Sequence, residues 1–126
     1  MKHNIMVCVT GPRTCDKLIA RGMERSADAE IHVVHCVETG RNFMNTPYEA
    51  DAIEYLFTAA QLAGAELSLV RADNVDDALV NYAENHGIQL IILGAGAAGG
   101  ANREPINLRL QRRLPGVEFD VVAAGS

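Results

Sequence analysis

Apolar residues gather in five short runs along the chain, and the segments between these runs repeat their apolar positions with a different spacing. The runs span residues 4–10, 30–37, 65–71, 88–94 and 117–124. A short run that is apolar at nearly every position is typical of a strand that is covered on both faces of a sheet. The sequence therefore predicts five strands, of which the fourth is the most apolar.

Four segments between these runs carry an apolar stripe with the spacing of an amphipathic helix. In chain order the stripes consist of Cys15, Ile19, Gly22 and Met23; of Ala50, Ile53, Phe57 and Ala60, flanked by Leu56 and Ala63; of Val75, Ala78, Leu79, Tyr82, Ala83 and His86; and of Leu110 and Leu114. The sequence predicts a helix at each of these stripes.

Residues suited to helix ends frame these stripes. Thr14 and Asn74 stand where a side-chain cap begins a helix. Gly64 and Gly87 stand where a glycine follows the last turn. Pro105 suits the first turn of the last helix. The boundaries of the predicted helices are therefore marked independently of their apolar spacing.

Strands that alternate with helices predict an α/β fold with a five-stranded parallel sheet and helices on both faces, a three-layer, flavodoxin-like sandwich. The 126 residues suit a single domain over residues 1–126. Ligands of such sheets bind beyond the carboxyl ends of the strands, where the strand order reverses. We expect that point between the first and fourth strands, where the loops 10–14 and 94–100 would meet.

The stretch "GAGAAGG" at residues 94–100 is the main candidate for a ligand-binding loop. Backbone N–H groups of such a loop can hold an anion, but glycine and alanine also let a turn pack tightly without any ligand; both interpretations stay open. The candidate nucleotide- or anion-binding residues are Thr10, Gly11, Gly94, Gly96, Gly99, Gly100, Arg103 and Asn107. We interpret the nearby arginines as a solvated helix face rather than an anion clamp; they are Arg109, Arg112 and Arg113.

Known catalytic and cofactor motifs do not fit the sequence. Gly94, Gly96 and Gly99 spell G-x-G-x-x-G, but after the fourth strand, whereas a dinucleotide-binding fold places that pattern after its first strand. No glycine is followed by lysine, so there is no Walker motif, and residues 5–10 hold no carboxylate for a phospho-receiver site. No nucleophile, base and acid converge on one set of loops. We expect no catalytic residues and no enzyme activity.

Composition and charge exclude several classes of protein. The net charge of −5 argues against nucleic-acid binding, which depends on a basic surface. No apolar run approaches the length of a membrane span, and the first residues lack the pattern of a secretory signal. The three cysteines form no C-x-x-C pair, which favours a reducing, cytoplasmic location.

The residues His32, His35 and Cys36 resemble a metal-binding cluster on paper. In a strand, His32 and Cys36 share one face and His35 points to the other, so these side chains cannot converge on one ion. We expect a structural role for them and no metal site. Cys15 stands at a helix start, where a thiolate is favoured, but it lies on the apolar stripe, so we expect a packed, unreactive thiol.

Four segments together resemble the universal stress protein family: "IMVCVTG", "IHVVHCV", "LVRADNVDDALVNYAENHGIQLIILGAG" and "LRLQRRLPGVEFDVV". Within that family the chain is most similar to the domain embedded in KdpD-type potassium-responsive sensor histidine kinases, which shares the "VCVTGP" strand end, the arginine-rich last helix and the L-P-G turn. The resemblance implies the three-layer fold that the family shares with adenine nucleotide alpha hydrolases.

The ATP-binding members of this family carry an Asp at the end of the first strand and a motif G-x-x-G, nine residues, G-[ST]. The Asp position is occupied by Thr10 here. Counting from Gly94 puts the final pair of the motif at Asn107-Leu108, and counting from Gly96 puts it at Arg109-Leu110. Counting back from the last strand gives Glu104-Pro105, where one carboxylate about 4 Å from a phosphate would cost about 4 kcal/mol. The resemblance therefore implies a degenerate ATP site.

We accordingly expect a regulatory or ligand-sensing domain without a required cofactor, with weak or absent ATP binding. A functional nucleotide-binding domain is the alternative. The last strand, with Val117, Phe119 and Val121 on one face, is expected at the sheet edge, where strand pairing would form a homodimer. A start at Met1 favours an independent polypeptide, and a partnership with a sensor kinase or transporter stays open.

Overall fold

The computed structural model describes residues 4–9, 15–26, 28–40, 49–94 and 106–122. Strands and helices alternate along the chain as the sequence predicts. They are β1 (Asn4–Cys8), α1 (Cys15–Ser26), β2 (Glu30–Glu38), α2 (Glu49–Leu62), β3 (Glu66–Ala72), α3 (Val75–Asn85), β4 (Ile88–Gly94), α4 (Ile106–Arg113) and β5 (Glu118–Val122). The bounds of β4 agree with the prediction, and those of the other strands differ from it by one or two residues.

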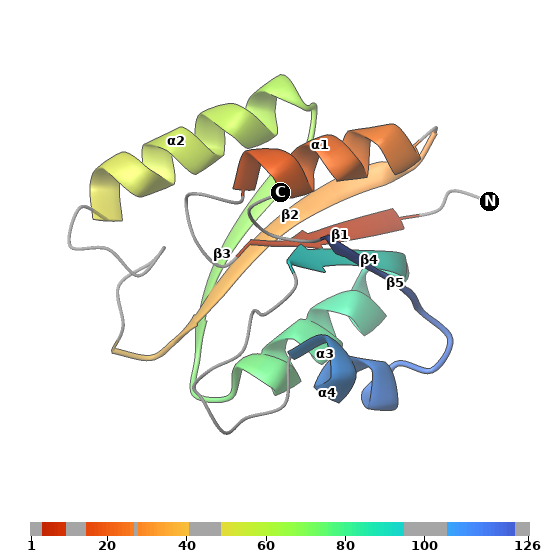
Figure 1. Cartoon of the computed structure of the whole chain (residues 1–126). Helices are drawn as coiled ribbons and strands as arrows, with labels where there is room; N and C mark the ends of the chain where they lie inside the picture. The colour runs from red at the N-terminus through yellow and green to blue at the C-terminus, as the bar shows by residue number, and fades with distance from the viewer. Residues whose placement is uncertain (1–3, 10–14, 27, 41–48, 95–105, 123–126) are drawn as a thin grey trace.

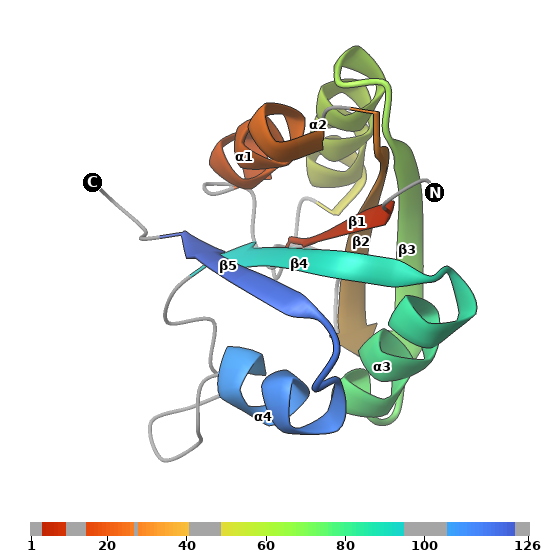
Figure 2. The same cartoon turned by 90° about the vertical axis from the view of Figure 1, so that its right-hand side faces the viewer.

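The five strands form one parallel sheet in the order β3-β2-β1-β4-β5. Helices α1 and α2 cover one face of the sheet, and α3 and α4 cover the other (Figures 1 and 2). The strand order reverses between β1 and β4, which confirms the predicted point. The predicted α/β fold class is also confirmed.

Two apolar cores fill the spaces between the layers. On the side of α1 and α2, Val7, Val33 and Ile92 are fully buried. On the side of α3 and α4, Met6 and Ile91 are fully buried. Neighbouring strand residues thus alternate between the two cores, which explains why the central strands are apolar at nearly every position.

One irregularity interrupts this alternation in β4. Asn4 pairs with Ile88, but Ile5 pairs with Leu90, so the register shifts around Gln89. The shift puts Ile88 and Ile91 in the same core, although they are three residues apart. The exposed Gln89 therefore lies at a β-bulge.

The predicted helix ends are confirmed where the structure describes them. The Oδ1 atom of Asn74 accepts a hydrogen bond of 2.9 Å from the backbone N–H of Asp77, which caps α3. Gly64 and Gly87 adopt the left-handed conformation, with φ of 68° and 59°. Thr14 and Pro105 lie outside the described residues.

The predicted apolar stripes are correct in part. Met23 is exposed, and Leu18 takes its place in the core beside Gly22. The helix turns this way because Gly22 lies directly against the sheet: a Cβ atom added to it would stand 3.0 Å from Val7. In α2 the large Phe57 is exposed, since the buried side of the helix is centred on Leu56 and alanines.

Two further positions correct the predicted stripes. Ala50 at the start of α2 and His86 after the end of α3 are exposed, whereas Val80, which the spacing did not select, is buried. Leu110 and Leu114 are buried as predicted. In the part of the chain that the structure describes, no helix is both long enough and apolar enough to span a bilayer.

Candidate functional site

A small apolar cavity lies at the carboxyl ends of the central strands, between the sheet and helices α3 and α4. It is lined by Cys8, Val9, Val34, Cys36, Val75, Leu79, Leu93, Ile106 and Leu110. Its volume is about 30 Å³, which is room for roughly two water molecules. A purine ring would need some of these side chains to move. None of the described residues that line the cavity is charged.

Two of the eight predicted binding residues lie within the described residues, and each directly follows a lining residue of this cavity in the chain. Gly94 ends β4 and follows the lining residue Leu93. Asn107 stands in the first turn of α4 and follows the lining residue Ile106. The other six, Thr10, Gly11, Gly96, Gly99, Gly100 and Arg103, lie outside the described residues, so their proposed role stays a prediction.

The arginines of α4 bind carboxylates at the start of α3. Arg109 donates two hydrogen bonds to Asp76, from Nε at 2.7 Å and from Nη2 at 3.1 Å. Arg113 donates one of 2.7 Å from Nη1 to Asp77. The predicted solvated helix face is confirmed for Arg112 and Arg113, which are exposed, whereas Arg109 is half-buried. The hydrogen bonds of Arg109 and Arg113 hold α4 against α3.

The thiols of the chain are protected by burial. Burial and the neighbouring Cys36 raise the pKa of Cys8 to about 12. Burial also raises the pKa of Cys36, and burial followed by the charge of Asp16 raises the pKa of Cys15. Cys15 is fully buried, which confirms the expected packed thiol. Its raised pKa supports the expected lack of reactivity, because the thiolate is the reactive form.

The two histidines of β2 lie on opposite faces of the sheet, as the strand alternation predicts. His35 is fully buried, and its Nδ1 donates a hydrogen bond of 2.6 Å to the backbone oxygen of Val9. Burial lowers the pKa of His35, and this hydrogen bond raises it to a smaller extent. His32 faces α3, where its Nδ1 lies 3.0 Å from the hydroxyl of Tyr82.

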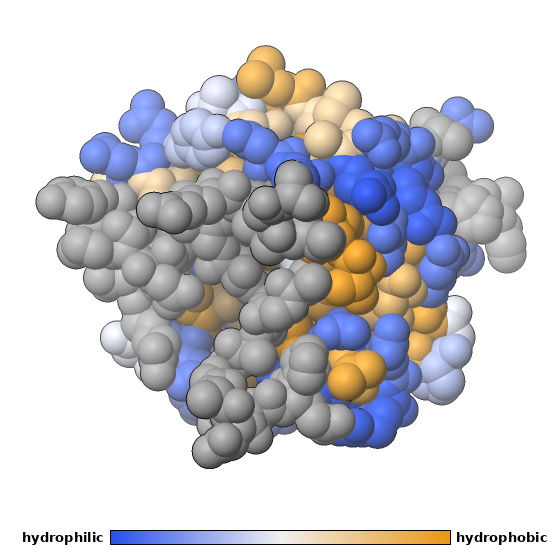
Figure 3. Space-filling view, in the orientation of Figure 1, coloured by the Kyte–Doolittle hydropathy of each residue, from blue (hydrophilic) through white to orange (hydrophobic). Residues whose placement is uncertain are grey.

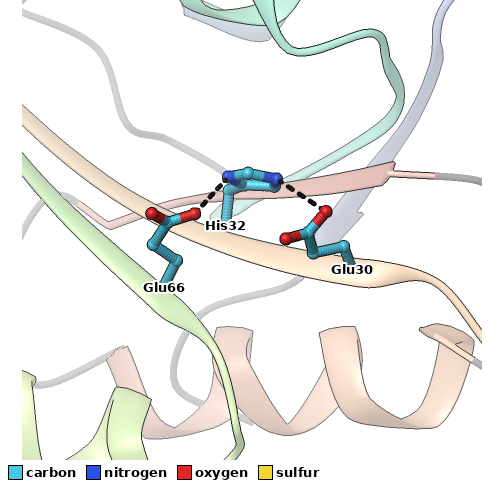
Figure 4. A group of neighbouring side chains, drawn as sticks. All are labelled: Glu30, His32 and Glu66. Carbon is cyan, nitrogen blue, oxygen red and sulfur yellow. Dashed lines mark ion pairs between the residues drawn. The ribbon is translucent and has the colours of Figure 1, made fainter.

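Around His32 the structure brings together a group of residues that the sequence analysis missed. The imidazole of His32 lies between the carboxylates of Glu30 and Glu66 (Figure 4). Glu30 precedes His32 by two positions, a signal that the sequence contains. Glu66 reaches the group only because it is paired with His32 across β2 and β3, a register that the sequence does not show.

Strand β5 lies at the edge of the sheet, as expected, and its two faces differ. Val117 and Phe119 are half-buried against the core beneath α4. On the other face Asp120 accepts hydrogen bonds from Arg21 and Arg25 of α1, between 3.0 and 3.1 Å long. Val121 is exposed, and an apolar patch lies over the end of β5 between hydrophilic surfaces (Figure 3).

The profile of the universal stress protein family matches residues 1–106. No curated protein matches the chain. Among solved structures, a universal stress protein in complex with cAMP is similar over 98% of both chains, with 20% identity and a TM-score of 0.65. A universal stress protein of Archaeoglobus fulgidus has 18% identity and a TM-score of 0.69, over 98% of this chain and 44% of that one.

A universal stress protein family member of Arabidopsis thaliana with bound AMP is similar over 98% of this chain and 93% of that one. The identity is 9% and the TM-score is 0.61. At these identities the structures establish a shared fold, with the same three layers around a parallel sheet. The match to the family profile is stronger evidence for the family than these structures are, because it covers residues 1–106 of the chain.

Proposed function

The chain belongs to the universal stress protein family, and from this premise we propose that it is a non-catalytic regulatory domain that senses a ligand and binds ATP weakly or not at all. The observation that supports this most strongly is the cavity at the switch point of the sheet. It is small and apolar, with no charged side chain among its described lining residues. A triphosphate carries several negative charges, which proteins hold with cations and N–H donors.

Among the described residues, one arginine of the helix that lines this cavity already binds a carboxylate. Arg109 lies on the same helix as the lining residue Leu110, but its guanidinium binds both carboxylate oxygens of Asp76. Turning it toward a phosphate would leave Asp76 without this partner. In the sequence, Thr10 replaces the family's Asp, and no register supplies the G-[ST] pair. All three features weaken ATP binding.

A second candidate is a sensor of a smaller adenine nucleotide. Two similar structures hold cAMP and AMP, each with a single phosphate. One phosphate needs fewer cations than three, and an apolar cavity suits the face of a base. Movement of the lining side chains Leu79 and Leu110 would enlarge the cavity of this chain.

A thermal-shift titration separates these candidates. A ligand at a hundredfold excess over its dissociation constant stabilises the folded state by about 2.7 kcal/mol, which raises Tm by roughly 10 °C for a domain of this size. We expect a rise of at most about 4 °C with MgATP at about 5 mM, because a dissociation constant weaker than about 1 mM gives at most about 1.1 kcal/mol of stabilisation there. A rise with AMP or cAMP alone supports the second candidate, and a rise of roughly 10 °C with MgATP contradicts the proposal.

The partners of this domain are also part of the proposal. We propose a cytoplasmic homodimer formed through β5, because this strand pairs only with β4 among the described residues and its edge invites a further strand. The resemblance to the domain of KdpD-type sensor kinases rests on sequence motifs alone, and on that ground we extend the proposal to a sensor kinase or a transporter as a further partner.

Light scattering tests the dimer. At a concentration on the order of 10 µM we expect the mass of two chains. The variant Val121→Glu adds a charge at the exposed end of β5 and should shift the mass to one chain. Leu62→Glu changes an equally apolar but more exposed side chain of α2 and should leave the mass unchanged. A monomeric parent chain excludes the dimer.

A further inference from the structure

We propose that Glu30, His32 and Glu66 form a binding site for a divalent transition-metal ion of the zinc type. The three residues stand at the amino ends of β2 and β3, away from the cavity at the carboxyl ends. Glu30 and His32 are two positions apart in β2 and therefore share a face. Glu66 is paired directly with His32 across the two strands, so all three side chains lie on the face that α3 covers.

The ligand atoms are close enough to share one ion. Glu30 Oε2 lies 4.0 Å from Nε2 of His32, the nitrogen that would bind the ion. Glu66 Oε2 lies 3.5 Å from the other nitrogen, Nδ1, so this exposed carboxylate has to turn toward Nε2 to reach the same ion. One ligand atom from each residue lies within 4.8 Å of the other two. Tetrahedral zinc with bonds of about 2.1 Å needs ligand atoms about 3.4 Å apart. The two carboxylates lie on either side of the ring (Figure 4) and both are exposed, so we expect their rotation to close this difference.

The second, independent observation is the unsatisfied nitrogen of His32. The residue is 3% exposed, and its buried Nε2 has no hydrogen-bond partner among the described residues. A buried polar atom without a partner costs free energy unless a ligand satisfies it. A metal ion at Nε2 supplies that partner.

The other ring nitrogen is arranged as metal-binding histidines require. Nδ1 of His32 lies 3.0 Å from the Tyr82 hydroxyl, which lies 3.3 Å from the Ser68 hydroxyl. If Nδ1–H donates to Tyr82 and Tyr82 donates to Ser68, Nε2 keeps a free lone pair. A histidine that binds a metal commonly donates its second N–H to such a partner, which fixes the tautomer.

Aromatic packing holds the ring of His32 in this orientation. Tyr82 meets it edge-on, with ring centres 5.8 Å apart, and the ring of His86 is tilted against it at 5.2 Å. His86 in turn stacks on Tyr82 with ring centres 3.9 Å apart. The nitrogen ligand is therefore preorganised, whereas the two exposed carboxylates can adjust to the ion.

The donor set selects the class of metal. One imidazole with two carboxylates suits Zn²⁺ and Co²⁺, because Mg²⁺ and Ca²⁺ prefer oxygen ligands alone. Water molecules can complete the coordination, since both carboxylates are exposed to solvent. This inference assigns His32 more than the structural role that the sequence suggested, and it does not depend on the nucleotide proposal.

Cobalt titration tests the site, because the visible absorption of Co²⁺ reports its coordination. We expect saturable 1:1 binding to the full chain. The variants Glu30→Gln and Glu66→Gln change exposed side chains, so they should fold normally and weaken binding at least tenfold. Glu54→Gln removes the same charge from an exposed position of α2 and should bind like the parent chain.

Three results of the cobalt titration would overturn the proposal. The first is a lack of saturable binding up to about 1 mM Co²⁺. The second is an equal affinity for Co²⁺ in the parent chain and in both glutamine variants. The third is a thiolate-to-cobalt charge-transfer band, which would place the ion on a cysteine. A chemical shift of the His32 ring carbons in NMR on adding Zn²⁺ is expected, and an unshifted ring would contradict the assignment. Titrations with Mg²⁺ and Ca²⁺ serve as controls and should show no saturable change.

Discussion

Replacing Arg109 with glutamine removes the two hydrogen bonds that its guanidinium donates to Asp76. These bonds join α4 to the first turn of α3, beside the cavity at the carboxyl ends of the strands. We assign Arg109 the structural task of joining the two helices, rather than phosphate binding. The variant should therefore lose stability while its response to nucleotides stays unchanged.

The size of the loss follows from the exposure of the pair. Both side chains are 23% exposed, so the pair is intermediate between solvated and buried ion pairs. A solvated pair contributes about 0.2–1 kcal/mol to stability, and breaking a buried pair costs about 3–5 kcal/mol. Two parallel hydrogen bonds favour a value above the solvated range. We expect an interaction energy of about 1.5 kcal/mol, which corresponds to roughly 6 °C in Tm for 126 residues.

A double-mutant cycle with Arg109→Gln and Asp76→Asn measures this interaction by urea unfolding. The cycle is needed because Asp76 also lies at the positive end of the α3 dipole, so its single replacement has a second effect. The pair of Arg113 and Asp77 joins the same two helices through one hydrogen bond, with side chains 44% and 55% exposed. It is the matched control, with an expected interaction of about 0.5 kcal/mol or less.

Two outcomes would refute this reasoning. Equal interaction energies for the two pairs would show that exposure does not decide their strength. A thermal shift with nucleotide that appears in the parent chain and disappears in Arg109→Gln would show that the guanidinium binds phosphate, contrary to the structural task assigned to it.

Three further predictions concern the two cores. Gly22→Val should lower the free energy of unfolding, measured with urea, by about 2 kcal/mol, because the added Cβ would stand 3.0 Å from Val7. Gly116→Val is the control: no atom lies within 4 Å of the added Cβ, so the urea midpoint should change little. Because the pKa of His35 is lowered in the folded chain, the unfolded chain binds a proton at this histidine at a higher pH. The free energy of unfolding should therefore fall as the pH drops below about 6.5, by at most about 1.4 kcal/mol per pH unit. An equally steep fall in the variant His35→Gln would contradict this. Cys8, with a pKa of about 12, should react with a thiol reagent at pH 8 only as fast as the chain unfolds, and rapid labelling of the folded chain would refute its burial.

The fold could be predicted because the apolar spacing and the residues at the helix ends indicate the same strands and helices. Apolar runs such as residues 88–94 mark buried strands, and Asn74 and Gly87 mark the two ends of one helix. The helix faces were less predictable, because Phe57 is apolar but faces solvent, while small alanines beside it lie against the sheet. Spacing alone does not show which of two neighbouring positions packs.

The side-chain groups could be predicted only where their members are close in sequence. Arg109 and Asp76 are 33 positions apart and meet only once α3 and α4 are packed together. Glu66 joins His32 only through the strand register. The bulge at Gln89 could not be predicted from the sequence either, because it depends on how β4 pairs with β1. The glycines of residues 96–100 remain candidates on sequence grounds.

Isothermal titration calorimetry with MgATP tests the central claim most directly, because it measures binding without requiring the ligand to stabilise the fold. We predict a dissociation constant weaker than about 1 mM, since none of the described residues that line the cavity is charged and the sequence lacks the family's phosphate-binding pair. Saturable binding with a dissociation constant of about 10 µM or tighter would contradict it.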